Sequence, residues 1–336
     1  MKIISKTLKL LTVFVLVLGI TGCSSDDDNN GSGVQTTTVV DVALANGLTS
    51  LAAALEATDL VTTLQGTGPY TVFAPDNDAF TALLTATGLD LNNLSAAEEA
   101  LVRNILLNHV IVGENLSSTD LINEGSGYRN TGATGPNGEN LSLYFSTSAG
   151  VVINGQSTVE TPDLTATNGT IHIVNTVIDL PTIATFATTN PALSNLVAAL
   201  QLADTGTPTV NWIATVSGNE NASLEPFTVF APTNDAFANL LLELDPSGNT
   251  GLGDLDPALV DSVLTVHVVA QANVQSNQLG SLSGVIPTVG GNLDLNGTVI
   301  TDTNDRDINI LAPTLVDIQA INGVVHVVDR VILPTL

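Results

Sequence analysis

The spacing of apolar residues predicts two similar helices, one near the start of each half of the chain. From Ala45 to Thr58, apolar residues recur every three or four positions, which is typical of a helix with one buried face. The same spacing returns from about Pro191 to Ala203. The predicted buried positions are Leu48, Leu51, Ala52 and Leu55 in the first helix, and Leu193, Leu196, Val197 and Leu200 in the second.

A β-type Thr-Val-Phe segment followed by a helix comes next in both halves. Pro75 is expected to end the first strand, and Asp76 can accept backbone N–H groups of the following helix. Thr233 takes the place of Asp76 in the second half. Apolar residues at helical spacing then start at Phe80 and Phe237. We therefore predict a strand-to-helix turn at both places.

A third predicted helix in each half leads into strands. Ser95–Glu98 has the Ser-x-x-Glu pattern of a capping box, and Asp256-Pro257 is the equivalent start in the second half. Short strands separated by Gly, Asn and Pro turns follow. The last ones, 170–174 and 324–328, alternate and are rich in β-branched residues. Each half is therefore predicted to be α+β, helix-rich first and strand-rich last.

The two halves are also repeats of each other. Residues 70–80 recur as 227–237, identical at nine of eleven positions and offset by 157. Residues 168–174 recur as 322–328, offset by 154, and the order of the motifs is the same in both halves. A fixed period of this kind indicates duplication of a whole structural unit. We predict two tandem domains.

The expected boundaries follow from the repeat. The first domain is predicted at 38–181 and the second at 182–336, because Leu180-Pro181 mirrors Leu333-Pro334 at the end of the chain.

The motifs of both repeats closely resemble the fasciclin (FAS1, or beta-Ig-H3) domain. They are Thr-Val-Phe-Ala-Pro-x-Asn-Asp-Ala-Phe, then an apolar-His-Val segment, then Asn-Gly-x-x-His-x-Val. The resemblance covers residues 38–336. It implies two β-sandwich wedges decorated with helices, and a role in extracellular adhesion or matrix association rather than in catalysis, with no cofactor.

Many fasciclin domains carry Tyr-His at the end of the central helix, in a segment linked to cell adhesion in animal members. The corresponding residues here are Asn108-His109 and Val266-His267. Because the Tyr is absent from both repeats, animal-type receptor binding does not carry over. Asn108, His109 and His267 remain candidate interaction residues.

Two polar segments carry aromatic residues. The connection between the first helix and the first strand is about 12 residues longer in the second repeat, and it holds Trp212, the only tryptophan. The polar segment 123–140 carries Tyr128 and Arg129. Exposed aromatic residues on loops are contact points for protein or glycan partners. Trp212 and Tyr128 are therefore candidates, with packing of Trp212 over its own core as the alternative.

The N-terminus is predicted to be a lipoprotein signal peptide. Three lysines flank the start of an apolar run of eleven residues, Leu10–Ile20, which is too short to span a bilayer comfortably. Ile20-Thr21-Gly22-Cys23 follows and resembles the bacterial lipobox, with Cys23 as the lipidated residue. An ordinary secretory signal with an unrelated cysteine is the alternative. Residues 1–22 would be removed, and no intramolecular disulfide is possible because Cys23 is the only cysteine.

Residues 23–37 are predicted to form an acidic, Gly/Ser-rich tether. The Asp26–Asp28 run just after the cysteine resembles the surface-export signal of some Gram-negative lipoproteins, although a solvated spacer is equally compatible. We expect an exported protein that is lipid-anchored to the outer membrane and exposed at the surface.

The strongly negative net charge of the chain excludes some classes of binding partner. The precursor has a formal net charge of −26. Removal of residues 1–22 takes away every lysine and leaves four arginines against 33 acidic residues, a net charge of −29. Such a chain repels nucleic-acid phosphates and offers no basic patch to an anionic membrane. We exclude nucleic acid and expect a cell-surface or matrix protein or a glycan.

The four histidines fall in repeat-equivalent pairs, His109 with His267 and His172 with His326. A duplicated residue favours a structural hydrogen-bonding role, because one active site rarely needs two copies of each part. No nucleophile elbow, phosphate-binding loop or His-Glu-x-x-His helix is present in the sequence. We therefore predict a protein that is not an enzyme.

Two acidic segments are candidates for calcium binding. Asn292-x-Asp294-x-Asn296-Gly297 matches half of an EF-hand loop but lacks the closing Glu, so a strand entering an Asn-Gly turn explains it better. Residues 302–307 form a dense acidic loop around Arg306. A solvated turn is expected there, with weak cation binding as the alternative.

These observations favour a surface-anchored bacterial lipoprotein that acts in adhesion or in matrix or biofilm interaction. The alternative is a binding module for a glycan or a small ligand, at the cleft between the domains or at the Trp212 loop.

Overall fold

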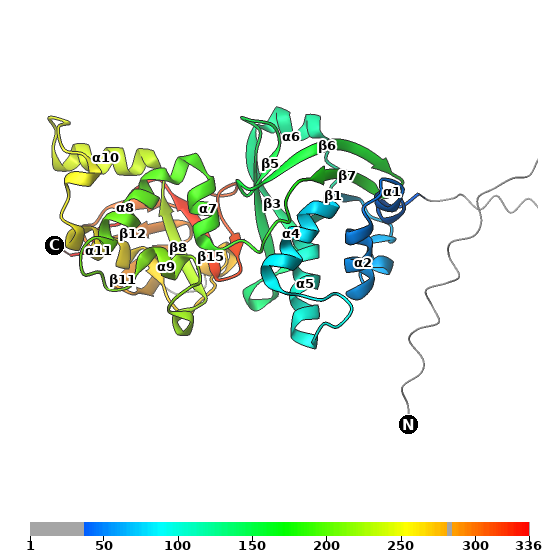
Figure 1. Cartoon of the computed structure of the whole chain (residues 1–336). Coiled ribbons are helices and arrows are strands. Elements are labelled where there is room, and N and C mark those ends of the chain that lie inside the picture. The colour runs from blue at the N-terminus through cyan, green and yellow to red at the C-terminus, as the bar shows by residue number, and fades with distance from the viewer. Residues whose placement is uncertain (1–36, 281–283, 336) are drawn as a thin grey trace, which may run out of the picture. The chain divides into compact units, whose positions relative to one another are not determined.

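Helices come first and strands last in the first repeat, as predicted (Figure 1). The computed structural model describes residues 37–280 and 284–335, so Cys23 and the predicted signal and tether lie outside the described residues. The helices are α1 (Val39–Ala45), α2 (Thr49–Ala57), α3 (Val61–Leu64), α4 (Asn77–Thr87), α5 (Ala96–Asn108), α6 (Ser118–Glu124) and the 3-10 turn η1 (Pro136–Gly138). The strands are β1 (Tyr70–Pro75), β2 (Val110–Val112), β3 (Ser126–Thr134), β4 (Asn140–Ser146), β5 (Val152–Ile153), β6 (Ser157–Ala166) and β7 (Gly169–Val174).

The second repeat follows the same overall order, with helices first and strands last. Its helices are α7 (Ile183–Thr189), η2 (Pro191–Leu193), α8 (Ser194–Asp204), α9 (Trp212–Val216), η3 (Ala222–Leu224), α10 (Asn234–Leu244), η4 (Leu252–Asp254), α11 (Pro257–Val266) and α12 (Ser276–Leu279). Its strands are β8 (Phe227–Pro232), β9 (Val268–Val269), β10 (Gly284–Thr288), β11 (Gly291–Asn296), β12 (Val299–Thr301), β13 (Asp307–Asn309), β14 (Ile318–Ala320) and β15 (Gly323–Val328). The predicted α+β class is confirmed in both repeats.

The sheets close differently in the two repeats. In the first, the seven strands hydrogen-bond in chain order and β7 pairs with β1, which closes a barrel. In the second, the described strands form two four-stranded sheets, ordered β10-β11-β12-β13 and β14-β15-β8-β9. None of the described helices is long and apolar enough to cross a membrane.

A parallel strand pair at the centre of each repeat places the Thr-Val-Phe motif beside the Asn-Gly-x-x-His motif. β1 pairs with β7, and β8 pairs with β15 in the same register. The glycine of the Asn-Gly motif starts the second strand of each pair. A Cβ atom at Gly169 would lie 2.1 Å from the carbonyl oxygen of Tyr70, and one at Gly323 would lie 2.2 Å from that of Phe227. The motif therefore needs glycine because the backbones approach too closely for a side chain.

The predicted helix starts are confirmed. Asp76 accepts the N–H of Ala79 at 2.7 Å and begins α4, and Thr233 caps α10 in the same way. The Ser95 and Glu98 side chains form the reciprocal capping box that begins α5. Asp256 caps α11, with Pro257 at its first helical position. These local patterns place each helix directly after its strand or loop.

The first predicted helix is divided in two. The expectation of a continuous helix from Ala45 to Thr58 is wrong at its start, because α1 ends at Ala45 and α2 begins at Thr49. Gly47, at a φ of +77°, makes the turn between them, a conformation that glycine adopts readily.

Each central strand separates two cores because its side chains alternate between faces. Val72 and Ala74 of β1 pack among the helices, whereas Phe73 faces the barrel interior with Leu143 and Phe145. In the second repeat Phe230 faces the strands in the same way, while its neighbours on β8 face the helices. Phe73 and Phe230 are both fully buried.

Candidate functional site

The histidines at the ends of α5 and α11 lock the last turn of the helix to the end of the repeat. In the first repeat, Nδ1 of His109 donates to the carbonyl of Ile105 at 2.7 Å, and Nε2 accepts the N–H of Ile178 at 2.8 Å. The equivalent bonds of His267 go to the carbonyl of Val263 at 2.7 Å and the N–H of Ile332 at 3.0 Å. Burial lowers the pKa of both imidazoles to about 4, so both are neutral at pH 7.

The histidines on the last strands also have structural partners. His172 stacks on Phe73 with ring centroids 5.5 Å apart. Its Nε2 lies 3.0 Å from the carbonyl of Leu116, and its Nδ1 accepts the N–H of Asp163 at 3.3 Å. The equivalent partners of His326 are Phe230, Val274 and Asp317. Burial lowers the pKa of both imidazoles. The predicted structural role of the four histidines is confirmed.

Ser118, Asp163 and His172 lie together, but they are not arranged as a catalytic triad. The Ser118 hydroxyl and backbone N–H both donate to the Asp163 carboxylate. Both imidazole nitrogens are engaged by the main chain, so no serine hydroxyl bonds to the base that would activate it. The cluster instead fastens the start of α6 to β6, and Ser276, Asp317 and His326 repeat it.

The sequence-based candidates for interaction are not exposed, which corrects that expectation. Asn108, His109 and His267 are all buried. The Asn108 amide donates to the carbonyl of Asp179 at 3.0 Å and accepts the Thr131 hydroxyl at 3.3 Å. The position next to the helix-end histidine therefore serves the fold in this chain.

Trp212 packs in the core, which is the alternative that the sequence left open for it, and so it is not an exposed contact residue. The insertion folds into helix α9, which Asp204 caps and which packs on α8. The Trp212 side chain is 1% exposed, and its indole N–H donates to Asp261 at 2.7 Å. A buried indole needs such a partner, and Asp261 on α11 provides it.

Tyr128 lies on strand β3 rather than on an exposed loop. Its ring is half-buried against Tyr144 and Phe186, with centroids 5.0 and 5.6 Å away. Its hydroxyl accepts the Asn190 amide at 3.0 Å. Burial raises the pKa of the phenol well above its ordinary value. The polar composition of segment 123–140 suggested a loop, but residues 126–130 and Thr134 pair with β4.

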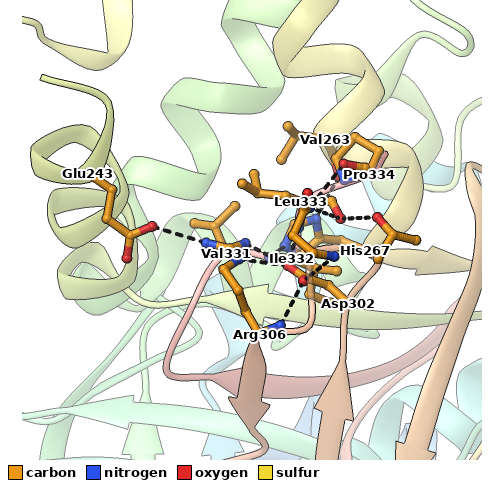
Figure 2. A network of polar contacts seen from close by, with 11 residues as sticks. Glu243, Val263, His267, Asp302, Arg306, Val331, Ile332, Leu333 and Pro334 are labelled. Carbon is orange, nitrogen blue, oxygen red and sulfur yellow. Dashed lines mark hydrogen bonds and ion pairs between the residues drawn. The ribbon is translucent and has the colours of Figure 1, made fainter. Parts of the chain in front are cut away.

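The acidic loop 302–307 is built around an internal cation (Figure 2). The buried Asp302 carboxylate accepts both Nε and Nη2 of Arg306, at 2.9 and 2.7 Å. It also accepts the backbone N–H groups of Asn304, Arg306 and Leu333. These five donors lower the pKa of Asp302 despite its burial.

The same arginine ties three segments together. Its Nη2 donates to the carbonyl of Val331 at 2.8 Å, and its Nη1 pairs with Glu243 of α10 at 3.2 Å (Figure 2). The guanidinium thus occupies the place that a bound cation would take. Across 37–280 and 284–335, no group of three or more His, Cys, Asp or Glu side chains is positioned to hold a metal ion.

The half EF-hand pattern is a β-hairpin, which confirms the prediction of a strand entering an Asn-Gly turn. Asn292–Asn296 lie on β11, and Gly297, at a φ of +63°, turns the chain into β12. Leu293 and Leu295 are buried, while Asp294 points to the exposed face. The alternation is therefore that of a half-buried strand.

A polar cavity of about 460 Å³ is lined by residues of both repeats, which belong to one compact unit. The lining comes from the segment between β2 and α6, from β3 and β4, and from the segment that leads into and begins β14. The residues are Glu114, Tyr128, Arg129, Asn130, Ser142, Pro313, Thr314, Val316, Asp317 and Ile318. Beside it, the Ser142 hydroxyl accepts the N–H of Gln319 at 3.0 Å.

Comparison with known proteins agrees with these duplicated features. The chain is similar to Protein sll1483 of Synechocystis, 37% identical over 165 residues that cover 46% of this chain and 74% of that protein. It is similar to the cell surface glycolipoprotein MPB83 of Mycobacterium bovis, 34% identical over 152 residues, 45% of this chain and 60% of that one. It is also similar to the transforming growth factor-beta-induced protein ig-h3 of Sus scrofa, 27% identical over 81% of this chain but only 35% of that protein.

Among solved structures, the chain is similar to a FAS1 domain pair from the insect cell adhesion molecule fasciclin I, with a TM-score of 0.46 and 21% identity. That likeness covers 88% of this chain and 95% of the other. The family model for the fasciclin domain matches residues 46–181 and again 191–334. Each match contains one parallel strand pair and two buried histidines. The chain therefore belongs to the fasciclin domain family, with two copies of the domain.

Proposed function

We propose that this protein is a lipid-anchored bacterial surface protein whose two fasciclin domains mediate adhesion or matrix and biofilm interaction. The double family match carries the proposal. The resemblance to a relative named as a cell surface glycolipoprotein supports surface display. The lipobox pattern ending at Cys23 supports attachment through lipid. A multiply acylated cysteine anchors stably, since each buried methylene contributes about 0.8 kcal/mol.

The chemistry of the described residues supports binding rather than catalysis. The histidines, the buried Trp212 and the Asp302 cluster all have internal partners that hold the domains together. We infer that binding uses the exterior, which is acidic and would be free of lysine once residues 1–22 are removed. A cell-surface or matrix protein, or a glycan, is the partner that this exterior fits.

Retention on matrix material tests the adhesion role. Beads coated with residues 36–336 are mixed with purified polysaccharide and protein fractions of the extracellular matrix, and an unrelated acidic protein of similar size controls for charge. We expect selective retention of at least one fraction by the fasciclin domains. Equal retention by both proteins, or by neither, would contradict the proposal.

A glycan or small polar ligand in the cavity between the repeats is a second candidate function. The cavity of about 460 Å³ has the size of ordinary ligand sites and offers amide, hydroxyl and carboxylate groups. A glycan array probed with Asn130→Ala tests it, because Asn130 is an exposed lining residue. Asn123→Ala is the matched control, since Asn123 is exposed and does not line the cavity. A ligand bound equally by both variants would exclude the cavity.

A further inference from the structure

Six Asn-Gly pairs occur in the described part of the chain. An asparagine that precedes glycine is prone to spontaneous deamidation, because glycine has no side chain to shield its backbone nitrogen from the asparagine amide. The six pairs share the same dipeptide, so their surroundings in the fold decide which of them reacts. They are Asn46-Gly47, Asn137-Gly138, Asn154-Gly155, Asn168-Gly169, Asn296-Gly297 and Asn322-Gly323.

The two pairs that belong to the duplicated Asn-Gly motif are protected. Asn168 and Asn322 are both buried, and their side-chain oxygens accept the backbone N–H groups of Val39 and Ile183, at 2.8 and 3.0 Å. Their amide nitrogens donate to main-chain carbonyls. A side chain that is held at both its oxygen and its nitrogen is not free to turn toward the next backbone nitrogen.

Three further pairs are restrained at one of the two reacting groups. The backbone N–H groups of Gly47 and Gly138 donate to main-chain carbonyls, at 3.0 and 3.2 Å. Asn154 is buried, and its side-chain oxygen accepts the N–H of Tyr144 at 2.8 Å. Each of these hydrogen bonds must break before the asparagine amide and the glycine nitrogen can react.

Asn296-Gly297, at the end of the β11–β12 hairpin, has both reacting groups free. Asn296 is exposed, and its side chain has no hydrogen-bond partner among residues 37–280 and 284–335. Gly297 is also exposed, and its N–H has no acceptor among the same residues. A Cβ atom built on Gly297 would meet nothing within 4 Å, so the approach to this backbone nitrogen is open.

We propose that Asn296 is a site of spontaneous deamidation. The backbone nitrogen of Gly297 attacks Cγ of Asn296 and forms a C–N bond, while the bond from Cγ to Nδ2 breaks. The amide leaves as ammonia and takes the proton of the glycine N–H, which leaves a succinimide ring. Water then opens the ring at either carbonyl. Opening at Cγ gives aspartate at position 296, and opening at the backbone carbonyl gives isoaspartate.

Both products alter the exposed end of the hairpin. Each adds one negative charge on the face of β11 that already exposes Asp294. Isoaspartate also lengthens the main chain by one methylene, because the chain then runs through the former side chain. This lengthening falls at the position that pairs with Val299, so the register of β11 and β12 is disturbed at the turn. The site does not depend on the proposed adhesion role.

Peptide mapping by mass spectrometry tests the proposal on residues 36–336, which form one compact unit. The folded protein is incubated at mildly alkaline pH, and the conversion of each Asn-Gly pair is followed with time. We expect conversion at Asn296 to be at least tenfold faster than at any of the other five pairs, with isoaspartate among its products. Faster conversion at another pair, or conversion at Asn296 without isoaspartate, would overturn the proposal.

The same incubation in urea separates the effect of the fold from that of the neighbouring sequence. Once the chain is unfolded, the six pairs should convert at rates within tenfold of one another, because burial and hydrogen bonds no longer protect five of them. If Asn296 kept its full lead in urea, its neighbours in the sequence would explain its reactivity and the structural argument would be refuted.

Two variants of strand β11 assign the acidic product that isoelectric focusing detects. Asn296→Gln keeps an exposed amide, but glutamine closes the required larger ring much more slowly, so the main acidic form should be lost. Asn292→Gln is the matched control, because Asn292 is exposed on the same strand and precedes leucine. It should leave the rate unchanged. An acidic form that persists in Asn296→Gln, or that disappears in Asn292→Gln, would contradict the assignment.

Discussion

Acidification should destabilise the second domain well above the pH at which most carboxylates titrate. The buried His267 has a pKa of about 4 in the folded protein, against an ordinary value of 6.5 in an unfolded chain. Between about pH 6.5 and pH 4 the His267 imidazole is therefore protonated in the unfolded chain but neutral in the folded domain. The contribution of the neutral imidazole is fully present above pH 6.5 and is lost as the pH falls toward 4.

The size of the effect follows from the two pKa values. Their difference of about 2.5 pH units corresponds to about 3 kcal/mol in full, at about 1.36 kcal/mol per unit. About 2 kcal/mol of this should be lost between pH 7 and pH 5. Burial also lowers the pKa of His326, which adds a loss of the same sign. Burial raises the pKa of Glu225, which opposes the loss because its carboxyl is easier to protonate in the folded state. Asp302 and Asp245, whose pKa values are lowered, matter only below about pH 4.

Urea unfolding followed by tryptophan fluorescence measures this domain selectively. Trp212 is the only tryptophan and is buried in the second repeat, so its emission shifts when that repeat unfolds. The free energy of unfolding from this signal should fall by about 2 kcal/mol or more between pH 7 and pH 5.

Two histidine variants test whether His267 causes this loss of stability. His267→Gln should flatten the pH dependence, whereas His109→Gln, in the other domain, should leave the Trp212 signal unchanged. Imidazole NMR shifts of the unaltered protein give an independent check if His267→Gln does not fold. A His267 pKa near 6.5, or a free energy that is constant from pH 7 to pH 5, would refute the reasoning.

Three further predictions concern stability. Phe230→Ala should cost about 3–5 kcal/mol, because it empties a fully buried site between the strands, and urea unfolding that is unchanged would show that this core is misplaced. Arg306→Ala should cost about 3 kcal/mol and speed hydrogen exchange in 331–334, because it leaves the buried Asp302 carboxylate without its cation; unaltered exchange there would argue against the network of Figure 2. Trp212→Phe should cost about 1.5–3 kcal/mol by circular dichroism, since Asp261 loses a charge-assisted hydrogen bond, and a neutral effect would mean that this bond does not support the insertion.

Helix starts could be predicted from the sequence because each depends on hydrogen bonds between residues that are close together in the chain. The caps at Asp76, Ser95 and Asp256 depend on residues two or three positions away, and the structure has all three. The duplicated motifs also predicted two domains. In each repeat the Thr-Val-Phe motif forms one strand of the central parallel pair, and the Asn-Gly-x-x-His motif forms the other.

Burial of the polar segments could not be predicted in this way. Trp212 enters the core because Asp261, 49 positions later, accepts its indole N–H. Tyr128 is covered by Tyr144 and Phe186, which pattern analysis does not connect to it. The acidic loop looked like a possible cation site because the sequence does not reveal that Arg306 turns back onto Asp302. The predicted interaction residues were wrong where contacts with residues far away in the sequence decide whether a side chain faces solvent.

Surface display through Cys23 is the central claim, and protease treatment of intact cells tests it most directly. An antibody to the second domain detects the protein before and after proteinase K treatment, with a periplasmic protein as the control. We predict that the fasciclin domains are digested while the control stays intact, and that Cys23→Ser removes the protein from the membrane fraction. Protection of the domains on intact cells would contradict surface display, and membrane retention of Cys23→Ser would contradict the lipid anchor.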